Sequence, residues 1–230
     1  MLPYFIFKKT LPVFPKKIVP NENGLIALGG ELNIPTLIEA YSKGIFPWSG
    51  EDPIPWYSPD PRLVLFPEKY YVSKRLERII KKDVFKVSFD VDFKRIIKKC
   101  SNIHRKGQNG TWINEKIIGA YYKLFNLEIA HCVAVYYNDI LCGGLYGLSF
   151  GKCFFGESMF SDVSNSSKVA LYFLTKFLIE KKINIIDCQQ VTPHMQRMGG
   201  ILIDRSLFLK LLKEYNSNEL NPYRWIMKKI

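Results

Sequence analysis

Short apolar runs, many of them bounded by glycines, dominate the second half of the chain. Ala130–Tyr137 and Ile140–Leu145 flank Asn138-Asp139, a two-residue signal for a β-hairpin. Within Gly143–Gly200, two apolar runs flank a Gly-Lys turn, and a later run ends in Asp187-Cys188-Gln189. Apolar runs of this kind predict strands in the interior of a sheet.

Helical periodicity is present between these strands and before them. The stretch after GESMFS (156–161) predicts a buried helix, because apolar residues surround it on nearly every side: Val169, Leu171, Phe173, Leu174, Phe177 and Leu178. Further helices are predicted at Pro35–Lys43, Ser73–Lys82, Phe93–Cys100, Asn114–Asn126 and Arg205–Tyr215, with a short one after Thr192-Pro193. Val84–Phe89 has the pattern of a strand.

Residues 1–62 are rich in prolines and turn residues. Five prolines fall between Ile45 and Arg62, so we expect this segment to lack regular structure. Its two tryptophans leave two alternatives open: a rigid loop held by aromatic packing, or a surface on which a base stacks. The pattern as a whole predicts an α+β fold, with a small N-terminal domain (1–62) and a larger domain (63–230) built on a hairpin-rich sheet. We expect the tail from Asn216 to Ile230 to be loosely held.

Composition adds a strong basic charge to this picture. The 230 residues are 47% hydrophobic and have a formal net charge of +12, which favours a polyanion as partner, with an anionic membrane surface as the second choice. No apolar stretch approaches the ~20 residues that span a bilayer. The apolar opening Met1–Phe7 is too short for a signal peptide.

Two predicted helices concentrate the basic residues. Lys74, Arg75, Arg78, Lys81 and Lys82 share one face of the first helix, and Glu77 is the single acidic residue among them. Ion pairs within the helix cannot balance so many like charges. The helix at Phe93–Cys100 repeats the pattern. Two basic amphipathic helices in succession predict contact with phosphates, which such faces bind by releasing counterions.

Three polar residues are candidates for chemistry: Glu157, Asp187 and Gln189. They lie at or near the ends of predicted apolar strands, where an unsatisfied polar group is costly. The five cysteines form no CxxC pair, so we expect reduced cysteines in a cytosolic protein and no zinc site. If strand alternation holds, Cys188 faces away from both of its neighbours, and we do not expect it to act as a nucleophile. His104, His131 and His194 are expected to be structural.

The order of short motifs along the chain resembles the leucyl/phenylalanyl-tRNA–protein transferase family. The motifs are NGLIALGGEL (23–32), GIFPW (44–48), WYSPDPR (56–62), GTWI (110–113), GGLYG (143–147), GESMFS (156–161), SKVAL (167–171) and IDCQ (186–189). The resemblance implies a small N-terminal domain followed by a C-terminal domain like that of the acetyltransferase (GNAT) superfamily, with a mixed sheet flanked by helices.

The resemblance also implies an activity. Such an enzyme moves leucine or phenylalanine, and also methionine, from aminoacyl-tRNA to the N-terminal Arg or Lys of a protein, which marks that protein for degradation by the N-end rule pathway. The implied partners are aminoacyl-tRNA and the acceptor protein. We expect a cytoplasmic monomer that uses no cofactor and no metal.

The resemblance further implies which residues form the site. The catalytic positions fall on Asp187, Gln189 and Glu157. The aminoacyl pocket falls on Leu145, Phe154, Leu171, Leu174 and Ile186. The tRNA-binding positions fall on Trp48, Trp112, Lys74, Arg78, Lys81 and Lys82.

The reaction does not require a strong general acid or general base. An α-amine has a pKa of about 7.7–8.0, so roughly a tenth of it is neutral at pH 7, and the aminoacyl ester is already activated. Holding amine and ester together supplies most of the rate. We therefore expect Gln189 to accept a hydrogen bond from the amine, with Asp187 orienting its amide. Glu157 has an alternative role as ion-pair partner of the acceptor's cationic side chain.

Two other function classes remain as rivals. An acetyl-CoA N-acetyltransferase would share the fold, but it usually needs a glycine-rich turn before a helix, whereas Asp162–Ser166 contains no glycine and one acid. A non-catalytic RNA-binding protein would explain the charge, but not Glu157 and Asp187 among apolar residues.

Overall fold

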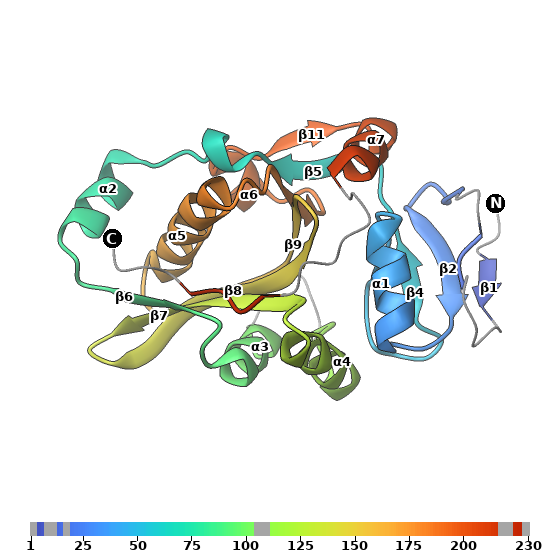
Figure 1. Cartoon of the computed structure of the whole chain (residues 1–230), viewed down its shortest axis with the longest axis horizontal. Coiled ribbons are helices and arrows are strands. Elements are labelled where there is room, and N and C mark those ends of the chain that lie inside the picture. Colours follow the sequence, from blue (N-terminus) through green and yellow to red (C-terminus); the bar gives the residue numbers. More distant parts are fainter. Residues whose placement is uncertain (1–3, 7–12, 16–18, 104–110, 216–222, 227–230) are drawn as a thin grey trace.

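Two β-sheets, one small and one large, organise the described part of the chain (Figure 1). The structure is a computed structural model, and it describes residues 4–6, 13–15, 19–103, 111–215 and 223–226. The expectation for His104, and that for most of the C-terminal tail, falls outside these ranges.

The small sheet lies at the N-terminal end of the molecule. Its strand order is β1 (Tyr4–Ile6), β2 (Leu25–Gly29), β4 (Pro55–Tyr57) and β3 (Phe46–Pro47), and helix α1 (Ile34–Ser42) packs beside it. The expectation that residues 45–62 lack regular structure is therefore wrong in part. Proline is tolerated in edge strands and at the first residue of a strand. Pro47 lies in edge strand β3 and Pro55 begins β4, so neither proline prevents pairing.

The large sheet is mixed, with seven strands in the described residues. Its order is β11 (Ile201–Ile203), β5 (Arg62–Leu65), β10 (Ile185–Gln189), β9 (Cys153–Ser161), β8 (Ile140–Phe150), β7 (Ala130–Tyr137) and β6 (Lys86–Phe89). Strands β6 to β9 pair antiparallel, and β7 and β8 form the hairpin that Asn138-Asp139 predicted. Strand β9 pairs parallel with β10. The predicted α+β class, a mixed sheet flanked by helices, is confirmed.

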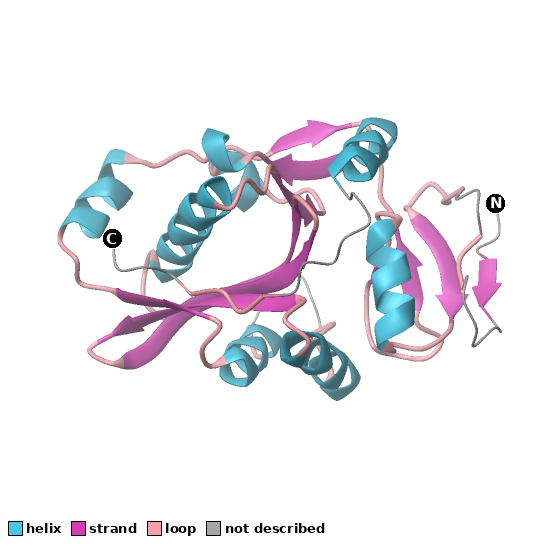
Figure 2. Cartoon of the chain, viewed as in Figure 1, coloured by secondary structure: helices cyan, strands magenta, loops and turns pink. Residues whose placement is uncertain are grey.

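Helices cover both faces of this sheet (Figure 2). One face carries α5 (Ser166–Glu180) together with α2 (Lys74–Lys81), the 3-10 helix η1 (Pro67–Lys69) and α6 (Pro193–Arg197), and the other carries α3 (Phe93–Ser101) and α4 (Glu115–Asn126). Helix α7 (Arg205–Tyr215) lies at the end nearest α1. A hydrophobic core lies on each face of the sheet, and the side chains of β7 point alternately into one and the other. Val133 and Val135 pack with α5, and Cys132 and Ala134 pack on the opposite face.

Polar side chains cap the starts of several helices. The Ser73 and Asn114 side chains accept backbone N–H groups at the starts of α2 and α4. Thr192 caps α6 in the same way. The expectation of a loosely held tail is wrong for Trp225, because its side chain is 1% exposed within the core beside α5.

Candidate active site

A pocket of about 350 Å³ opens where the end of the small sheet meets strands β8, β9 and β10. All five residues expected in an aminoacyl pocket line it: Leu145, Phe154, Leu171, Leu174 and Ile186. Trp48, Trp112, Glu157 and Gln189 line it as well. Asp187 does not, and its side chain is 0% exposed. The pocket thus combines an apolar wall and two indole rings with polar side chains that include Glu157 and Gln189.

The apolar wall belongs to the core on the α5 side of the large sheet. Strands β8, β9 and β10 contribute one residue each, and α5 contributes Leu171 and Leu174, which are one helical turn apart. Gly147 allows this packing, since a Cβ there would lie 2.5 Å from the Phe154 ring and 2.2 Å from the Phe155 carbonyl oxygen. Such a wall accepts apolar side chains and disfavours charged ones by desolvation.

A β-bulge in the middle of β9 determines the direction of the Glu157 side chain. Tyr146 pairs with Ser158 and Gly147 pairs with Gly156, which leaves Glu157 without a partner on β8. A bulge of this kind turns a side chain out of the strand's normal alternation. The expectation that Glu157 lies near a strand end is therefore wrong, because the bulge lies inside the strand.

The Glu157 carboxyl group is buried in a hydrogen-bond network. Tyr41 Oη donates to Oε1 at 2.7 Å, Gln189 Nε2 donates to Oε1 at 2.8 Å, and Tyr121 Oη donates to Oε2 at 3.3 Å. The two phenol oxygens also lie within hydrogen-bond distance of each other. A hydrogen bond between them requires a proton on Glu157, because each phenol has a single proton and both are donated to the ionised carboxylate. Burial raises the pKa of Glu157 to about 7, although the hydrogen bonds oppose this shift. Burial also raises the pKa of both phenols, so both stay protonated donors.

A second bulge ends strand β10. Asp187 pairs with Val64 and Gln189 pairs with Leu63, so Cys188 is the extra residue, and Gln189 has a φ of 62°. The expected alternation fails here, because Cys188 and Gln189 both line the pocket. Burial raises the pKa of the Cys188 thiol well above its ordinary value. The thiol stays protonated, and this is the reason it is a poor nucleophile.

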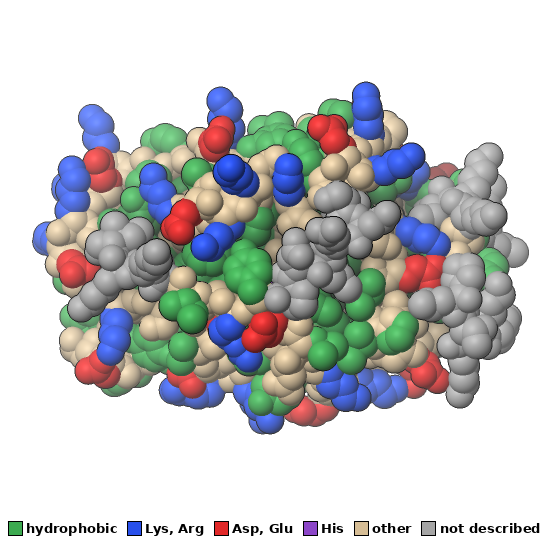
Figure 3. Space-filling model, in the orientation of Figure 1, with side chains coloured by type: hydrophobic (Ala, Val, Ile, Leu, Met, Phe, Trp, Pro, Cys, Tyr) green, Lys and Arg blue, Asp and Glu red, His purple; other side chains and the backbone are tan. Residues whose placement is uncertain are grey.

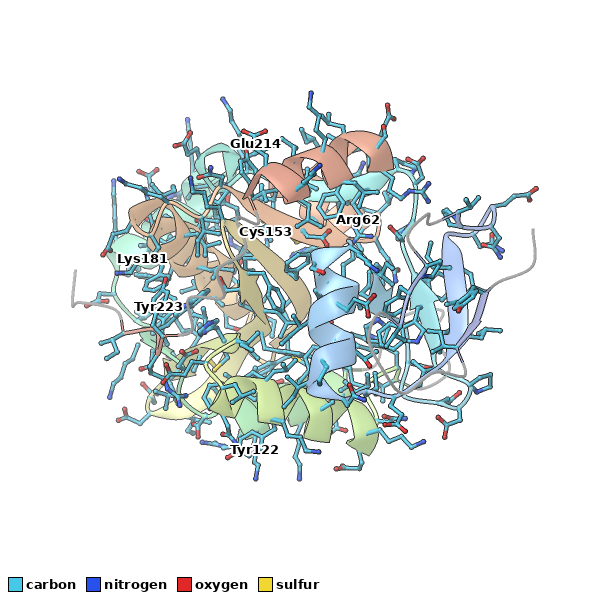
Figure 4. The ribbon with its side chains drawn as sticks, turned by 45° about the vertical axis from the view of Figure 1, so that its right-hand side comes forward. Arg62, Tyr122, Cys153, Lys181, Glu214 and Tyr223 are labelled. Carbon is cyan, nitrogen blue, oxygen red and sulfur yellow. The ribbon has the colours of Figure 1, made fainter. Side chains whose placement is uncertain are left out.

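Asp187 is one half of a buried ion pair that sequence reasoning missed. Arg62 Nε and Nη2 donate to its two oxygens at 2.8 and 2.6 Å, and the Arg62 side chain is 1% exposed. The guanidinium lies between the rings of Phe46 and Phe208, at 4.9 and 4.6 Å from their centroids. Figure 4 shows Arg62 beneath α7. The partners are 125 residues apart, so no local pattern indicates the pair.

Asp187 does not orient the side-chain amide of Gln189. Its Oδ1 accepts the backbone N–H of Gln189 at 2.9 Å, whereas the Gln189 amide nitrogen bonds to Glu157. The expectation that Asp187 holds the amide is therefore wrong. Asp187 binds the backbone N–H of Gln189, and Glu157 binds the side-chain amide of Gln189. With Nε2 occupied in this way, Gln189 Oε1 has no hydrogen-bond partner within the described ranges.

The histidines have surroundings that the sequence did not indicate. His194 lines the pocket, and burial lowers its pKa, with Lys168 and Arg197 adding to the effect, so its ring is neutral near pH 7. His131 is buried against Asp90, with Nδ1 and Oδ2 2.9 Å apart.

The basic face of α2 lies away from the pocket. Lys74, Arg78, Lys81 and Lys82 are exposed, and none of them lines the pocket. Lys81 pairs with Glu77 at 3.2 Å, which leaves most of this charge facing solvent. Figure 3 shows Lys and Arg side chains along the rim of one face, including the end where α2 lies. Within the described residues, no helix has the length and apolar character to cross a membrane.

Comparison with known proteins places the chain in a family. The family model described as leucyl/phenylalanyl-tRNA protein transferase matches residues 64–213, and the model for the N-terminal domain of the same family matches residues 30–60. The chain belongs to this family. A leucyl/phenylalanyl-tRNA–protein transferase of Thermodesulfovibrio yellowstonii is 45% identical over 93% of this chain and 87% of its own length. The one from Flavobacterium johnsoniae is 43% identical over 91% and 99%.

Membership confirms the resemblance stated from the motifs and identifies the chain as an aminoacyltransferase. Solved structures match more distantly. An aminoglycoside acetyltransferase from a soil metagenomic sample is 12% identical over 64% of this chain and 98% of its own, with a TM-score of 0.37. The L-PGS structure from Bacillus licheniformis is 7% identical over 70% and 51%, with a TM-score of 0.35.

Proposed function

We propose that the protein transfers leucine, phenylalanine or methionine from aminoacyl-tRNA to the N-terminal Arg or Lys of an acceptor protein, and that this marks the acceptor for degradation. One observation carries the proposal: the wholly apolar wall of the pocket meets Gln189 and Glu157 in the same cavity. An apolar aminoacyl side chain fits against the apolar wall, and the reacting amine contacts Gln189 and Glu157.

In this proposal the enzyme binds the aminoacyl-tRNA through both its aminoacyl side chain and its RNA. The side chain enters the apolar wall, while the indole rings of Trp48 and Trp112 stack on the terminal bases of the tRNA. The exposed basic face of α2 contacts the phosphate backbone farther along.

Gln189 is the residue that meets the acceptor amine. Because Glu157 fixes its amide nitrogen, Oε1 is directed to accept a hydrogen bond from the amine. The amine nitrogen attacks the ester carbonyl carbon, the bond to the ribose oxygen breaks, and the proton lost by nitrogen ends on that oxygen. No strong base is required, since the neutral amine is accessible near pH 7.

Asp187 acts through Gln189 and not on the substrate. It is fully buried, it is absent from the pocket wall, and its carboxylate holds the Gln189 backbone while Arg62 neutralises its charge. We therefore assign Asp187 a positioning role. Glu157 has two compatible roles: it fixes the Gln189 amide, and in its ionised form it attracts the cationic end of the acceptor.

We further propose that the enzyme acts as a cytoplasmic monomer with two domains divided near residue 62. All five cysteines are free, which supports a reducing compartment.

The direct test incubates the purified protein with labelled Leu-tRNA and a peptide that begins with Arg. We expect the label in a peptide product. The matched controls are the same peptide with an acetylated N-terminus and a peptide that begins with Glu, neither of which should be labelled. Transfer from acetyl-CoA to the Arg peptide, with none from Leu-tRNA, would replace the proposal with the acetyltransferase alternative.

A further inference from the structure

The C-terminal segment at residues 223–226 inserts one large side chain behind the apolar pocket. The Trp225 indole packs against Phe177 of α5 and Phe89 of β6, with ring centroids 4.7 and 6.3 Å apart. It belongs to the same core cluster as all five residues of the apolar wall, yet it does not line the pocket. Figure 1 shows the segment as the dark red trace that crosses the large sheet in this view.

Trp225 is held in a fixed position by β7 and the turn that follows β6. Its backbone N–H donates to Asp90 Oδ2 at 2.7 Å, and its ring stacks on the buried His131 ring at a centroid distance of 4.0 Å and an angle of 7°. Asp90 also accepts the Cys132 backbone N–H at 3.0 Å. An indole fixed at its backbone and on one ring face forms a rigid support.

That support lies directly behind a residue of the pocket wall. The Phe154 ring, which lines the pocket, is 5.6 Å from the Trp225 ring, centroid to centroid. A Cβ on Gly147 would touch the Phe154 ring, so β8 closes off another side of the same ring. Phe154 is therefore confined between β8 and Trp225, and it cannot withdraw from the pocket without displacing the indole.

We propose that Trp225 sets the depth of the donor pocket by supporting Phe154, and thereby determines how the enzyme discriminates between leucyl and phenylalanyl donors. This rests on the proposed function, in which the apolar wall receives the donor side chain. A smaller side chain at position 225 leaves room behind Phe154, and the Phe154 ring moves into that room. The deeper pocket then accommodates the larger phenylalanyl side chain better and contacts the leucyl side chain less completely.

The experiment compares kcat/KM for Phe-tRNA and Leu-tRNA in the full-length Trp225→Leu variant. We expect the ratio of phenylalanyl to leucyl transfer to rise by about tenfold, the lower end of what apolar pockets achieve per methylene of fit. General loosening of the fold would lower both rates together and leave the ratio unchanged. Trp225→Phe retains an aromatic ring and should shift the ratio in the same direction by a smaller factor, which provides the test if Trp225→Leu folds poorly.

Two control variants separate the inference from the proposed function. Phe89→Leu also removes volume next to Trp225, but the ring contacts of Phe89 in the described residues are with Phe177 and Trp225 and not with Phe154, so it should leave the ratio unchanged. Leu174→Phe narrows the pocket directly and should lower the ratio. If Leu174→Phe changes the ratio and both Trp225 variants leave it within about twofold of the original, the inference is overturned and the pocket stands. If Leu174→Phe leaves the ratio unchanged as well, the assignment of the donor pocket fails.

Discussion

At the scale of single residues, the site depends on two buried carboxyl groups in opposite electrostatic states. Asp187 has a guanidinium as its partner, whereas Glu157 has only neutral donors. Hydrogen bonds from neutral donors offset only part of the free energy lost when a charge is buried, so burial raises the pKa of Glu157 to about 7. The protonated form fits its surroundings, because Oε2 can donate to Tyr121, which donates to Tyr41, which donates to Oε1.

The first prediction concerns Glu157 and the pH dependence of stability. Its pKa is raised from 4.5 to about 7 on folding, so its stabilising contribution is complete below about pH 4.5 and is lost as the pH rises through about 7. Glu157→Gln keeps the hydrogen bonds and does not titrate. The free energy of unfolding, measured with urea, should therefore fall more steeply with pH in the wild type, by up to about 3 kcal/mol in total. Parallel pH profiles for the two proteins would show that Glu157 does not titrate on folding.

The second prediction concerns the ion pair between Arg62 and Asp187. Asp187→Asn leaves a buried guanidinium without a counter-charge, which should lower the free energy of unfolding by about 3–5 kcal/mol. It should also slow peptide transfer, because the Gln189 backbone loses its charged acceptor. The measurements are urea unfolding and single-turnover transfer from saturating Leu-tRNA.

A double variant is the control for this prediction. Adding Arg62→Gln to Asp187→Asn removes the unpaired charge and retains a hydrogen bond between the two side chains, so stability should recover in part. If Asp187 only positions Gln189, transfer should recover along with stability. Recovery of stability with no recovery of transfer would show that the carboxylate itself acts on the reaction.

At the scale of helices and strands, the sequence predicted the elements whose formation depends on the local pattern of residues. Periodicity located α2, α4 and α5 closely, and the Asn138-Asp139 signal located the hairpin of β7 and β8, because these elements are determined within a few residues. The bulges at Glu157 and Cys188 were not predictable. Each is defined by register against a neighbouring strand, and a strand's own sequence does not specify that register.

The third prediction concerns helix α2. Lys74→Glu combined with Arg78→Glu should weaken binding of every aminoacyl-tRNA by a similar factor, because phosphate contacts carry no base information. The slope of log affinity against log salt concentration should become shallower by about one to two units. Filter binding over a range of salt concentrations measures both quantities.

The matched control reverses two exposed lysines on another helix. Lys210→Glu combined with Lys213→Glu on α7 changes the net charge equally. We expect it to alter the salt slope less than the α2 variant does. Equal effects of the two variants would show that binding responds to total charge and not to the basic face of α2.

At the scale of the whole molecule, buried contacts join the small sheet and its helix to the large sheet. Tyr41 of α1 bonds to Glu157, and Phe46 of β3 packs on the guanidinium of Arg62. The Phe208 ring of α7 covers the other side of that guanidinium and approaches Gly44 so closely that a Cβ there would lie 3.0 Å from it. Sequence reasoning predicted a small N-terminal unit but not these contacts, because every pair is formed by residues far apart in the chain.

The last prediction follows from these contacts. Removing the small sheet would leave Glu157 without Tyr41 and would open one side of the Arg62 pair to water, so the large sheet should not keep its site once the small one unfolds. We therefore expect one cooperative transition in urea, with tryptophan fluorescence and far-UV circular dichroism giving the same midpoint. Trp48 and Trp56 report on the small sheet, and Trp112 and Trp225 report on the rest. Tyr41→Phe, which removes a single hydroxyl from the contact, should lower that shared midpoint without splitting the transition. Two separate midpoints, with the tryptophans of the small sheet changing first, would show that the units are thermodynamically independent and that their contacts contribute little to the site.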